Sequence, residues 1–366
     1  METTTLKNQI ALTLLNGIGP VKAKLLAAKM GSLEAIFKAS LSTLHHETGI
    51  SKSVLKNMNR KTALERATGE VDFILKEELT THFYTEINYP RRLKQCDDAP
   101  LLLFSKGNFN PNPTRVIAVV GTRNATNYGK KICEDFIQHL AGCNLQIVSG
   151  MAYGIDICAH TASVRNQLET VGVLGHGLDR LYPSIHRKVA EKMIEHGGLI
   201  SEYLPGTNPD RENFPMRNRI VAGMVDAVVV IESKKSGGSL ITADLANDYN
   251  KDVFAFPGNV DQEFSAGCNA LIQQQKAHLL VSGAQFLKEM NWLESQQVTT
   301  FQRSCFIDLS DDEQAVCNLL SRTQGEHIDV LAIQTKTPIS KMNVLLFHLE
   351  MKGVIQALPG KKYQLI

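Results

Sequence analysis

Basic and small residues recur together in loops that follow a series of short apolar runs. The basic residues are Arg123, Lys130, Arg211, Arg217, Arg219, Lys234 and Lys235. The small residues are Gly121, Ser149, Gly150, Gly237 and Gly238. Small residues let the backbone approach a ligand closely, and helix N-termini supply oriented N–H groups for an anion. Positive charge from several loops beside such turns predicts a site for a phosphate-bearing ligand.

The apolar runs predict the fold that positions these loops. They are Val116–Val120, Leu145–Val148, Val171–Leu174, Leu199–Ile200, Ala227–Ile231, Val253–Phe256 and His278–Val281. Helical segments are expected between them, near 128–141, 155–165, 184–196, 215–223, 239–249 and 267–276. Such alternation indicates an α/β fold, an extended Rossmann-like, doubly wound parallel sheet, over residues 76–293. Pro100–Phe104 is a further strand candidate, and ligands of such sheets bind beyond the carboxyl ends of the strands.

The two flanking segments read as smaller helical domains. In residues 1–75, Asn16–Pro20 precedes a helix carrying Val21, Leu25 and Leu26 on one side, and 44–55 repeats the unit around Gly49. This predicts an all-α helix-hairpin-helix or SAM-like module, whose turns either accept a DNA phosphate or only connect helices tightly. After a loose stretch at 294–303, residues 304–366 predict a winged helix. Its expected helices and wing strands are Asp311–Leu320, Asp329–Gln334, Ser340–Met351, Val354–Leu358 and Tyr363–Ile366.

Composition narrows the class of protein. The net charge of +2 is uneven: residues 1–70 hold ten Lys and Arg against five Asp and Glu, whereas residues 305–366 hold six against seven. The seven cysteines are odd in number and lack Cys-x-x-Cys spacing, which favours reduced thiols and no metal site. The N-terminus resembles no export signal and no run is long enough to span a membrane, so a cytoplasmic protein is expected.

Common nucleotide and catalytic motifs are missing or broken. No Gly-x-Gly-x-x-Gly follows the first predicted strand, and Gly129-Lys130 is followed by Lys131 where a P-loop needs Ser or Thr. No cofactor and no catalytic residue is therefore expected. Several residues keep two interpretations. Arg217 and Arg219 either face the ligand or pair with Glu202 and Glu232. Acids beside arginines, such as these two glutamates, are more often structural than a catalytic pair. His160 and His176 are more often hydrogen-bonded than acid–base groups, and Phe214 is either a core residue or a surface ring.

A set of motifs resembles the DprA/Smf family, in order and at the expected intervals. The motifs are Tyr89-Pro90, Asp98-Ala99-Pro100, Gly121-Thr122-Arg123, Ser149-Gly150-x-Ala-x-Gly154-Ile155-Asp156, Tyr182-Pro183, Ser201-Glu202-Tyr203, Phe214-Pro215-x-Arg217-Asn218-Arg219 and Gly238-Ser239-Leu240-Ile241-Thr242-Ala243. The resemblance implies binding of single-stranded DNA, protection of incoming DNA in natural transformation, and loading of the RecA recombinase. It also implies a homodimer formed through the Rossmann-like domain, with Arg123, Arg211 and Phe214 in the DNA groove.

The alternative is a related Rossmann-type hydrolase that cleaves nucleoside monophosphates. Such enzymes carry a Pro-Gly-Gly-x-Gly-Thr-x-x-Glu loop with a catalytic glutamate. Here the comparable segment, 236–244, reads Ser-Gly-Gly-Ser-Leu-Ile-Thr-Ala-Asp. Its second glycine pair is broken and the glutamate is absent, with Asp244 the nearest acid.

Overall fold

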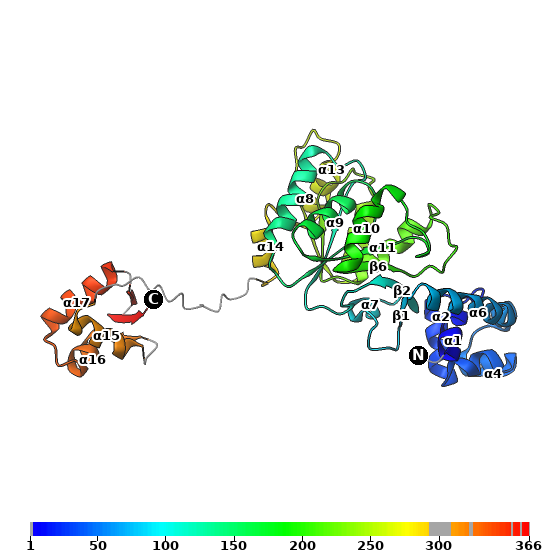
Figure 1. Ribbon diagram of the computed structural model, residues 1–366, viewed down its shortest axis with the longest axis horizontal. Coiled ribbons are helices and arrows are strands. Elements are labelled where there is room, and N and C mark those ends of the chain that lie inside the picture. Colours follow the sequence, from blue (N-terminus) through cyan, green and yellow to red (C-terminus); the bar gives the residue numbers. More distant parts are fainter. Residues whose placement is uncertain (1–2, 293–308, 322–324, 353, 359–360, 366) are drawn as a thin grey trace. The chain divides into compact units, whose positions relative to one another are not determined.

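The chain divides into two compact units, Met1–Trp292 and Leu293–Ile366, which are described here from a computed structural model. The structure describes residues 3–292, 309–321, 325–352, 354–358 and 361–365. The loose stretch at 294–303, Cys305, Pro359-Gly360 and Ile366 lie outside the described residues. The predicted boundary at residue 75 falls inside the first unit (Figure 1).

A nine-stranded sheet forms the centre of the first unit, in the order β1-β2-β6-β5-β4-β3-β7-β8-β9. Its strands are β1 (Thr80–Phe83), β2 (Leu102–Gly107), β3 (Val116–Val120), β4 (Gln146–Ser149), β5 (Glu169–Val173), β6 (Gly197–Ser201), β7 (Ala227–Val230), β8 (Asp252–Ala255) and β9 (His278–Leu279). The seven strands from β6 to β9 pair in parallel, whereas β1 and β2 join the edge antiparallel. The predicted α/β fold with a large parallel sheet is confirmed, and the strand expected at Pro100–Phe104 is part of its antiparallel edge.

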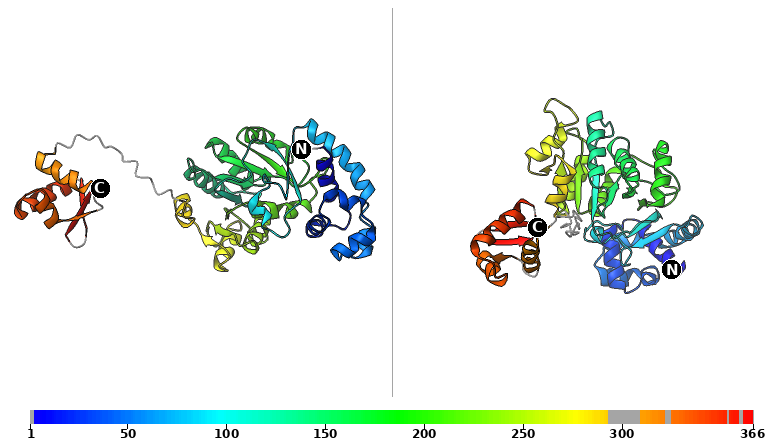
Figure 2. Two further views of the ribbon diagram at one scale, coloured as in Figure 1. Left: turned by 90° about the horizontal axis from the view of Figure 1, so that it is seen from below. Right: turned by 60° about the vertical axis from the view of Figure 1, so that its left-hand side comes forward.

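Alternate residues of each central strand face opposite layers of helices, as a doubly wound sheet requires. Ile117 and Val119 face one apolar core, and Val116 and Ala118 face the other. The first core is covered by α8 (Asn127–His139), α9 (Ile155–Arg165) and α14 (Gly283–Glu289). The second is covered by α7 (Arg91–Lys94), α11 (Asn213–Gly223), α12 (Gly238–Asp248) and α13 (Ala266–Gln273). On the side of α9, the 3₁₀ turn Ser184–His186 leads into α10 (Arg187–Glu195), which packs on β6 (Figures 1 and 2).

The N-terminal helices pack on the antiparallel edge of this sheet. They are α1 (Thr3–Thr13), α2 (Pro20–Met30), α3 (Leu33–Lys38), α4 (Leu41–Thr48), α5 (Lys52–Lys56) and α6 (Arg60–Lys76). Their core continues into Phe83 of β1 and Phe104 of β2, so the module and the sheet share buried surface. The helix predicted after Pro20 is present, but only Leu26 of its expected apolar side is buried. Val21 is 64% exposed and Leu25 is 36% exposed, because α2 packs through Ala23 and Leu26.

The second unit is a winged helix, as predicted. It contains α15 (Asp311–Leu320), β10 (Glu326–His327), α16 (Ile328–Gln334), α17 (Ile339–Met351), β11 (Ile355–Leu358) and β12 (Lys362–Leu365). The strands form a sheet in the order β10-β12-β11, one strand more than the expected two-stranded wing. Ser310 and Glu313 form a reciprocal capping box that defines where α15 begins. Across the described part of both units, no helix has the length and hydrophobicity needed to span a bilayer.

Candidate functional site

A groove of about 610 Å³ opens at the carboxyl ends of the central strands. It lies where the strand order reverses, because β3 is followed along the chain by β4 on one side while β7 lies on its other side. Ligands of doubly wound sheets bind at such a switch point. The groove is lined from the loops after β3, β4 and β7 and from the first turns of α11 and α12.

The loop after β3 is held against the loop after β4 by backbone contacts. The Ile155 N–H at the start of α9 donates to the Thr122 carbonyl at 3.1 Å, and the Thr122 N–H donates to the Glu232 carbonyl at 2.8 Å. Gly154 has a φ of +78°, and a Cβ there would collide with the backbone of Thr122 and Arg123. A Cβ at Gly121 would collide with Ile155. These glycines are required by close approach, and they bring Arg123 to the mouth of the groove.

Glu232 anchors the first turn of α8 from the end of β7. Its carboxylate accepts hydrogen bonds from the Thr126 N–H at 3.0 Å and from the Thr126 hydroxyl at 2.6 Å. The same hydroxyl accepts from the Gly129 N–H as the N-cap of α8. Within the part of the chain that the structure describes, Glu232 is therefore a buried structural acid that pairs with no arginine.

A buried arginine and a buried acid lie beneath the groove. Arg217 of α11 is 6% exposed, and its guanidinium donates to the Val173 carbonyl at the end of β5. The carboxylate of Asp156, 7% exposed, lies close enough to interact electrostatically with it. A Cβ at Gly150 would collide with both side chains, so glycine makes room for the pair. Burial raises the pKa of Asp156, and the nearby guanidinium opposes that rise.

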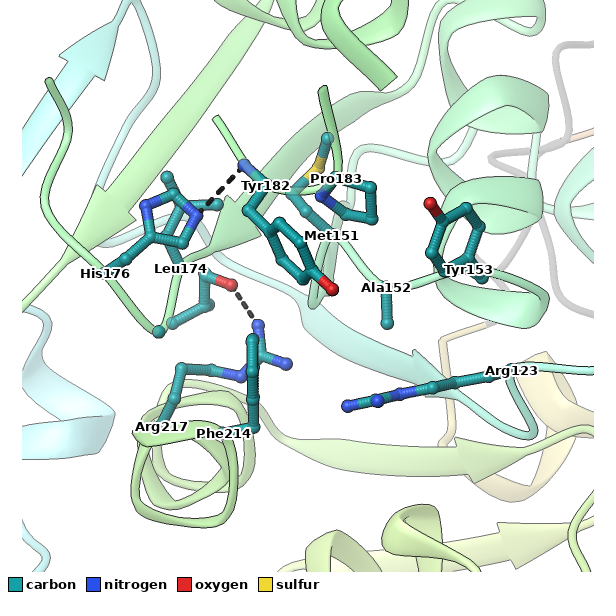
Figure 3. Close-up of a pocket in the computed structure, with 12 residues that line it drawn as sticks. Arg123, Met151, Ala152, Tyr153, Leu174, His176, Tyr182, Pro183, Phe214 and Arg217 are labelled. Carbon is teal, nitrogen blue, oxygen red and sulfur yellow. Dashed lines mark hydrogen bonds between the residues drawn. The ribbon is translucent and has the colours of Figure 1, made fainter. Parts of the chain in front are cut away.

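An aromatic cavity of about 60 Å³ adjoins the groove and shares several residues with it (Figure 3). The Arg123 guanidinium lies 5.4 Å from the centroid of the Phe214 ring, within the range of a cation–π contact. The Tyr182 ring lies 6.1 Å from Phe214, and Tyr153 stands on the far side of the cavity. Phe214 is half-buried, so one part of its ring supports the cavity wall while another part faces the groove.

Free positive charge and helix N–H groups meet in this groove. Among the described residues, neither Arg123 nor Arg211 forms an ion pair, and both side chains are exposed. Lys234 also lines the groove, but its ammonium pairs with Glu263 at 2.8 Å. The N-terminus of α12 follows Gly237 with no side-chain cap and no acid in its first turn. The arrangement can accept an anion beside an aromatic ring.

The structure brings together most of the residues that the sequence predicted for this site. The following line the groove: Gly121, Arg123, Gly150, Arg211, Phe214, Arg217, Gly237 and Gly238. Lys130 and Lys235 are exposed but are not among the lining residues. Ser149 is fully buried and donates to the Val119 carbonyl, so its hydroxyl holds two strands together.

Arg219 also lies outside the lining and has a structural partner. Its two terminal nitrogens donate to the two Glu202 oxygens at 2.8 and 2.5 Å, and the side chain is buried. Of the two pairings considered from the sequence, Arg219 with Glu202 is confirmed. Arg217 and Arg219 stand two residues apart on a helix, so they point to different sides of it.

Both histidines considered from the sequence are hydrogen-bonded and buried. His160 bonds to the Thr170 hydroxyl and to the Gly150 carbonyl, each at 2.7 Å. The Nε2 atom of His176 accepts from the Tyr182 N–H at 3.2 Å, and its Nδ1 atom lies 2.9 Å from the Gly177 carbonyl. These bonds fix the backbone around the cavity, which is the structural interpretation of both residues.

Sequence reasoning did not assign a role to several lining residues. Asp156, Tyr153, Tyr182 and Asn218 belong to the motifs or loops around the site, yet none was predicted as a site residue. Their motif positions were the available signal. Nothing in the local sequence distinguishes an acid below the groove from one that faces solvent.

Comparisons with known proteins find matches to both units of the chain. The family model described as DNA recombination-mediator protein A matches residues 80–291, and the DprA winged helix domain matches residues 307–361. The Smf protein of Synechocystis is 30% identical over 97% of both chains. The crystal structure of DNA processing protein A from Streptococcus pneumoniae has a TM-score of 0.65 and 33% identity, covering 77% of this chain and 97% of that one. DNA processing protein A from Helicobacter pylori, whose structure concerns its single-stranded DNA binding mode, has a TM-score of 0.54 and 27% identity over 59% of this chain and 96% of that one.

The burial of His160 predicts a pH-dependent loss of stability. Desolvation lowers the pKa of His160 to about 4, whereas the unfolded side chain keeps its ordinary value near 6.5. The unfolded chain therefore binds this proton first, and stability is lost as the pH falls from about 6.5 toward about 4. Between pH 7 and pH 5 we expect His160 to account for a loss of about 2 kcal/mol in the free energy of unfolding.

Urea unfolding of His160→Gln at the two pH values measures this contribution. The variant should show a smaller pH-dependent loss than wild type, even if it is less stable at both pH values. His196→Gln, at an exposed position, is the matched control and should keep the wild-type dependence. An unchanged dependence in His160→Gln would contradict the prediction.

Proposed function

Because the chain belongs to the DprA/Smf family of DNA recombination mediators, we propose that it binds single-stranded DNA in the groove at the carboxyl ends of β3, β4 and β7. The observation that carries the proposal is the convergence in one groove of Arg123 and Arg211, which form no ion pair with any described residue, and the half-exposed ring of Phe214. This combination matches both parts of a single strand, its phosphates and its exposed bases.

Phosphate binding would use the arginines and the uncapped end of α12. An Arg guanidinium can donate two parallel hydrogen bonds to one phosphate. The N–H groups at Gly238 and Ser239 are at a helix N-terminus that lines the groove, and they carry the positive end of the helix dipole. The contact set that we propose is Gly121, Arg123, Gly150, Arg211, Phe214, Arg217, Gly237 and Gly238, with Lys130 and Lys235 as outer cations. Ser149 and Arg219 are left out because neither lines the groove and each is buried on a protein partner.

The biological role that we propose follows from the family. In this role the protein acts in the cytoplasm, protects incoming single strands during natural transformation and loads the RecA recombinase onto them. It does so as a homodimer formed through the Rossmann-like domain. Family membership supports all of these steps. The exposed cationic groove supports the protection of single strands, because protection requires binding.

Binding without catalysis is favoured over cleavage of nucleoside monophosphates. Asp244, the acid nearest to the position of the hydrolase glutamate, is exposed and pairs with Lys276 at 2.8 Å rather than lining the groove. Among the described residues that line the groove, Asp156 is the one with a carboxylate, and it faces the buried Arg217. General acid–base work requires a carboxyl group within hydrogen-bonding reach of the substrate.

We expect a clear preference for single strands over duplex DNA. A blunt duplex keeps its bases stacked inside, so Phe214 has no base face to contact. Affinity should fall as the salt concentration rises, because bound phosphates release counterions. Gel-shift titration with a thymidine oligomer and a blunt duplex, at several salt concentrations, measures both effects. Equal affinity for the two, or multiple turnovers of free base from nucleoside monophosphates, would remove the basis of the proposal.

Arg123→Ala and Phe214→Ala should weaken binding in distinguishable ways. Loss of Arg123 removes a phosphate contact, so affinity should fall for every sequence and the magnitude of the salt slope should fall by about one unit or less. Loss of the uncharged Phe214 ring should leave the slope unchanged and cost about 1–3 kcal/mol of stacking.

Two control variants separate these contacts from general effects. Arg165→Ala removes an exposed cation from the C-terminal end of α9, whereas the groove lies at its N-terminal end. This variant should bind DNA like wild type. Phe214→Tyr keeps an aromatic face and should retain most of the affinity, whereas unfolding of Phe214→Ala would be visible by circular dichroism. If folded Arg123→Ala and Phe214→Ala both bind a thymidine oligomer like wild type, the contact residues lie elsewhere, for example on the basic N-terminal module.

The winged helix should contribute little to the affinity for single strands. Residues 305–366 hold six Lys and Arg against seven Asp and Glu, so the domain has no excess of positive charge. Two of its lysines are also paired, Lys341 with Asp312 at 2.6 Å and Lys352 with Glu313 at 2.8 Å. The exposed side of α17 instead presents the apolar residues Val344, Phe347 and Met351. Deleting residues 305–366 should therefore change the affinity by less than about tenfold, or roughly 1.4 kcal/mol. A larger loss in the gel-shift titration would assign a DNA-binding role to this domain.

A further inference from the structure

Two cysteines meet between the helices that carry the arginine loop. Cys133 is in the second turn of α8, and Cys158 is the fourth residue of α9. Their thiols form a hydrogen bond with each other across the packed helices. Cys133 is fully buried, whereas Cys158 is half-buried and its thiol also donates to the Lys130 carbonyl at 3.7 Å. We propose that this pair is an oxidation site, at which hydroperoxides convert the two thiols into a disulfide.

The surroundings divide the two roles between the sulfurs. The hydrogen bond from Cys133 lowers the pKa of Cys158, and Lys130 and Arg165 act in the same direction against burial and Glu134. The position near the N-terminus of α9 also favours a thiolate. By contrast, the pKa of Cys133 is raised, by the hydrogen bond that it donates to Cys158 and by burial. A half-buried thiol with a lowered pKa beside a buried thiol that can resolve it is the arrangement expected of a peroxide-sensing pair.

The reaction balances with one peroxide molecule. The Cys158 thiolate takes an oxygen atom from hydrogen peroxide, which leaves as hydroxide, and becomes a sulfenic acid. Cys133 then attacks this sulfur, its proton joins the departing hydroxyl group as water, and the S–S bond forms. Together the two thiols lose two electrons and two protons, and the peroxide is reduced to two molecules of water.

Bond formation at this position must disturb the groove. A disulfide brings two sulfurs from hydrogen-bonding distance to about 2.0 Å, which draws α8 and α9 together. The loops at the start of both helices have no slack: the Ile155 N–H bonds to the Thr122 carbonyl, and Gly154 has no room for a Cβ against Arg123. The contraction is therefore passed to the loop that carries Arg123, and oxidation should weaken DNA binding.

Thiol titration of the full-length protein under denaturing conditions tests the chemistry. The reduced chain has seven cysteines, and hydrogen peroxide should remove two thiols, with peptide mass spectrometry locating the bond between Cys133 and Cys158. Cys158→Ser, which has six cysteines, should keep all six thiols. Cys133→Ser should stop at a sulfenic acid on Cys158 that dimedone labels. Cys143→Ser, which changes another half-buried cysteine of the same domain, is the matched control and should still form the bond.

Gel-shift titration of oxidised and re-reduced protein tests the consequence. The oxidised wild type should bind a thymidine oligomer about tenfold more weakly, dithiothreitol should restore the affinity, and oxidised Cys158→Ser should bind like the reduced protein. Retention of all seven thiols, a disulfide between other cysteines, or unchanged affinity of the oxidised protein would each overturn the proposal. The effect on affinity rests on the proposed function, but the thiol measurement does not. If the reduced protein bound no DNA and the disulfide still formed, the proposed function would fail while the oxidation site stood.

Discussion

The charge of Arg217 is held below the surface of the groove, and the site is built around that constraint. A buried charge requires a partner and hydrogen-bond acceptors, because the desolvation of an ion costs several kcal/mol. The Val173 carbonyl accepts from the guanidinium, the Asn218 side chain accepts from its Nε atom at 3.2 Å, and Asp156 supplies the opposite charge. These partners come from α9, from β5 and from α11 itself. Arg217 therefore ties a helix on one face of the sheet to a strand end and to a helix on the other face.

The glycines of the site follow from this packing. Gly150 leaves the space that Arg217 and Asp156 occupy, and Gly175 lies against the Phe214 ring, which a Cβ there would approach to 3.2 Å. The ring is thereby held at one edge while the groove remains open on its other side, and Arg123 approaches it from the loop after β3. Because Arg217 and the Phe214 ring are held by neighbouring residues before a ligand binds, ordering these two side chains costs little conformational entropy on binding.

Local patterns in the sequence were sufficient for the parallel part of the sheet and its helices, and for several glycines at close backbone approaches. Hydrophobic periodicity identified β3 and α9 to within a residue or two, because buried parallel strands and amphipathic helices leave strong local patterns. Gly121, Gly150 and Gly237 were recognised for the same reason, since tight turns restrict residue type. The antiparallel position of β2 depends on its pairing with β6, nearly a hundred residues away, which no local pattern records.

The arginines show where local reasoning ends. Arg217 and Arg219 lie in one short motif and are equally basic, but a step of two residues turns them about 200° apart on the helix. Arg217 faces Asp156 beneath the groove, and Arg219 pairs with Glu202. The structural interpretation of this motif is therefore confirmed for Arg219, whereas ligand contact by Arg217 stays a prediction. The same limit applies to Cys133 and Cys158: their 25-residue separation resembles no redox motif, and only the packing of α8 on α9 brings the two sulfurs together. Chemistry that depends on contact between elements becomes visible only when the elements are assembled.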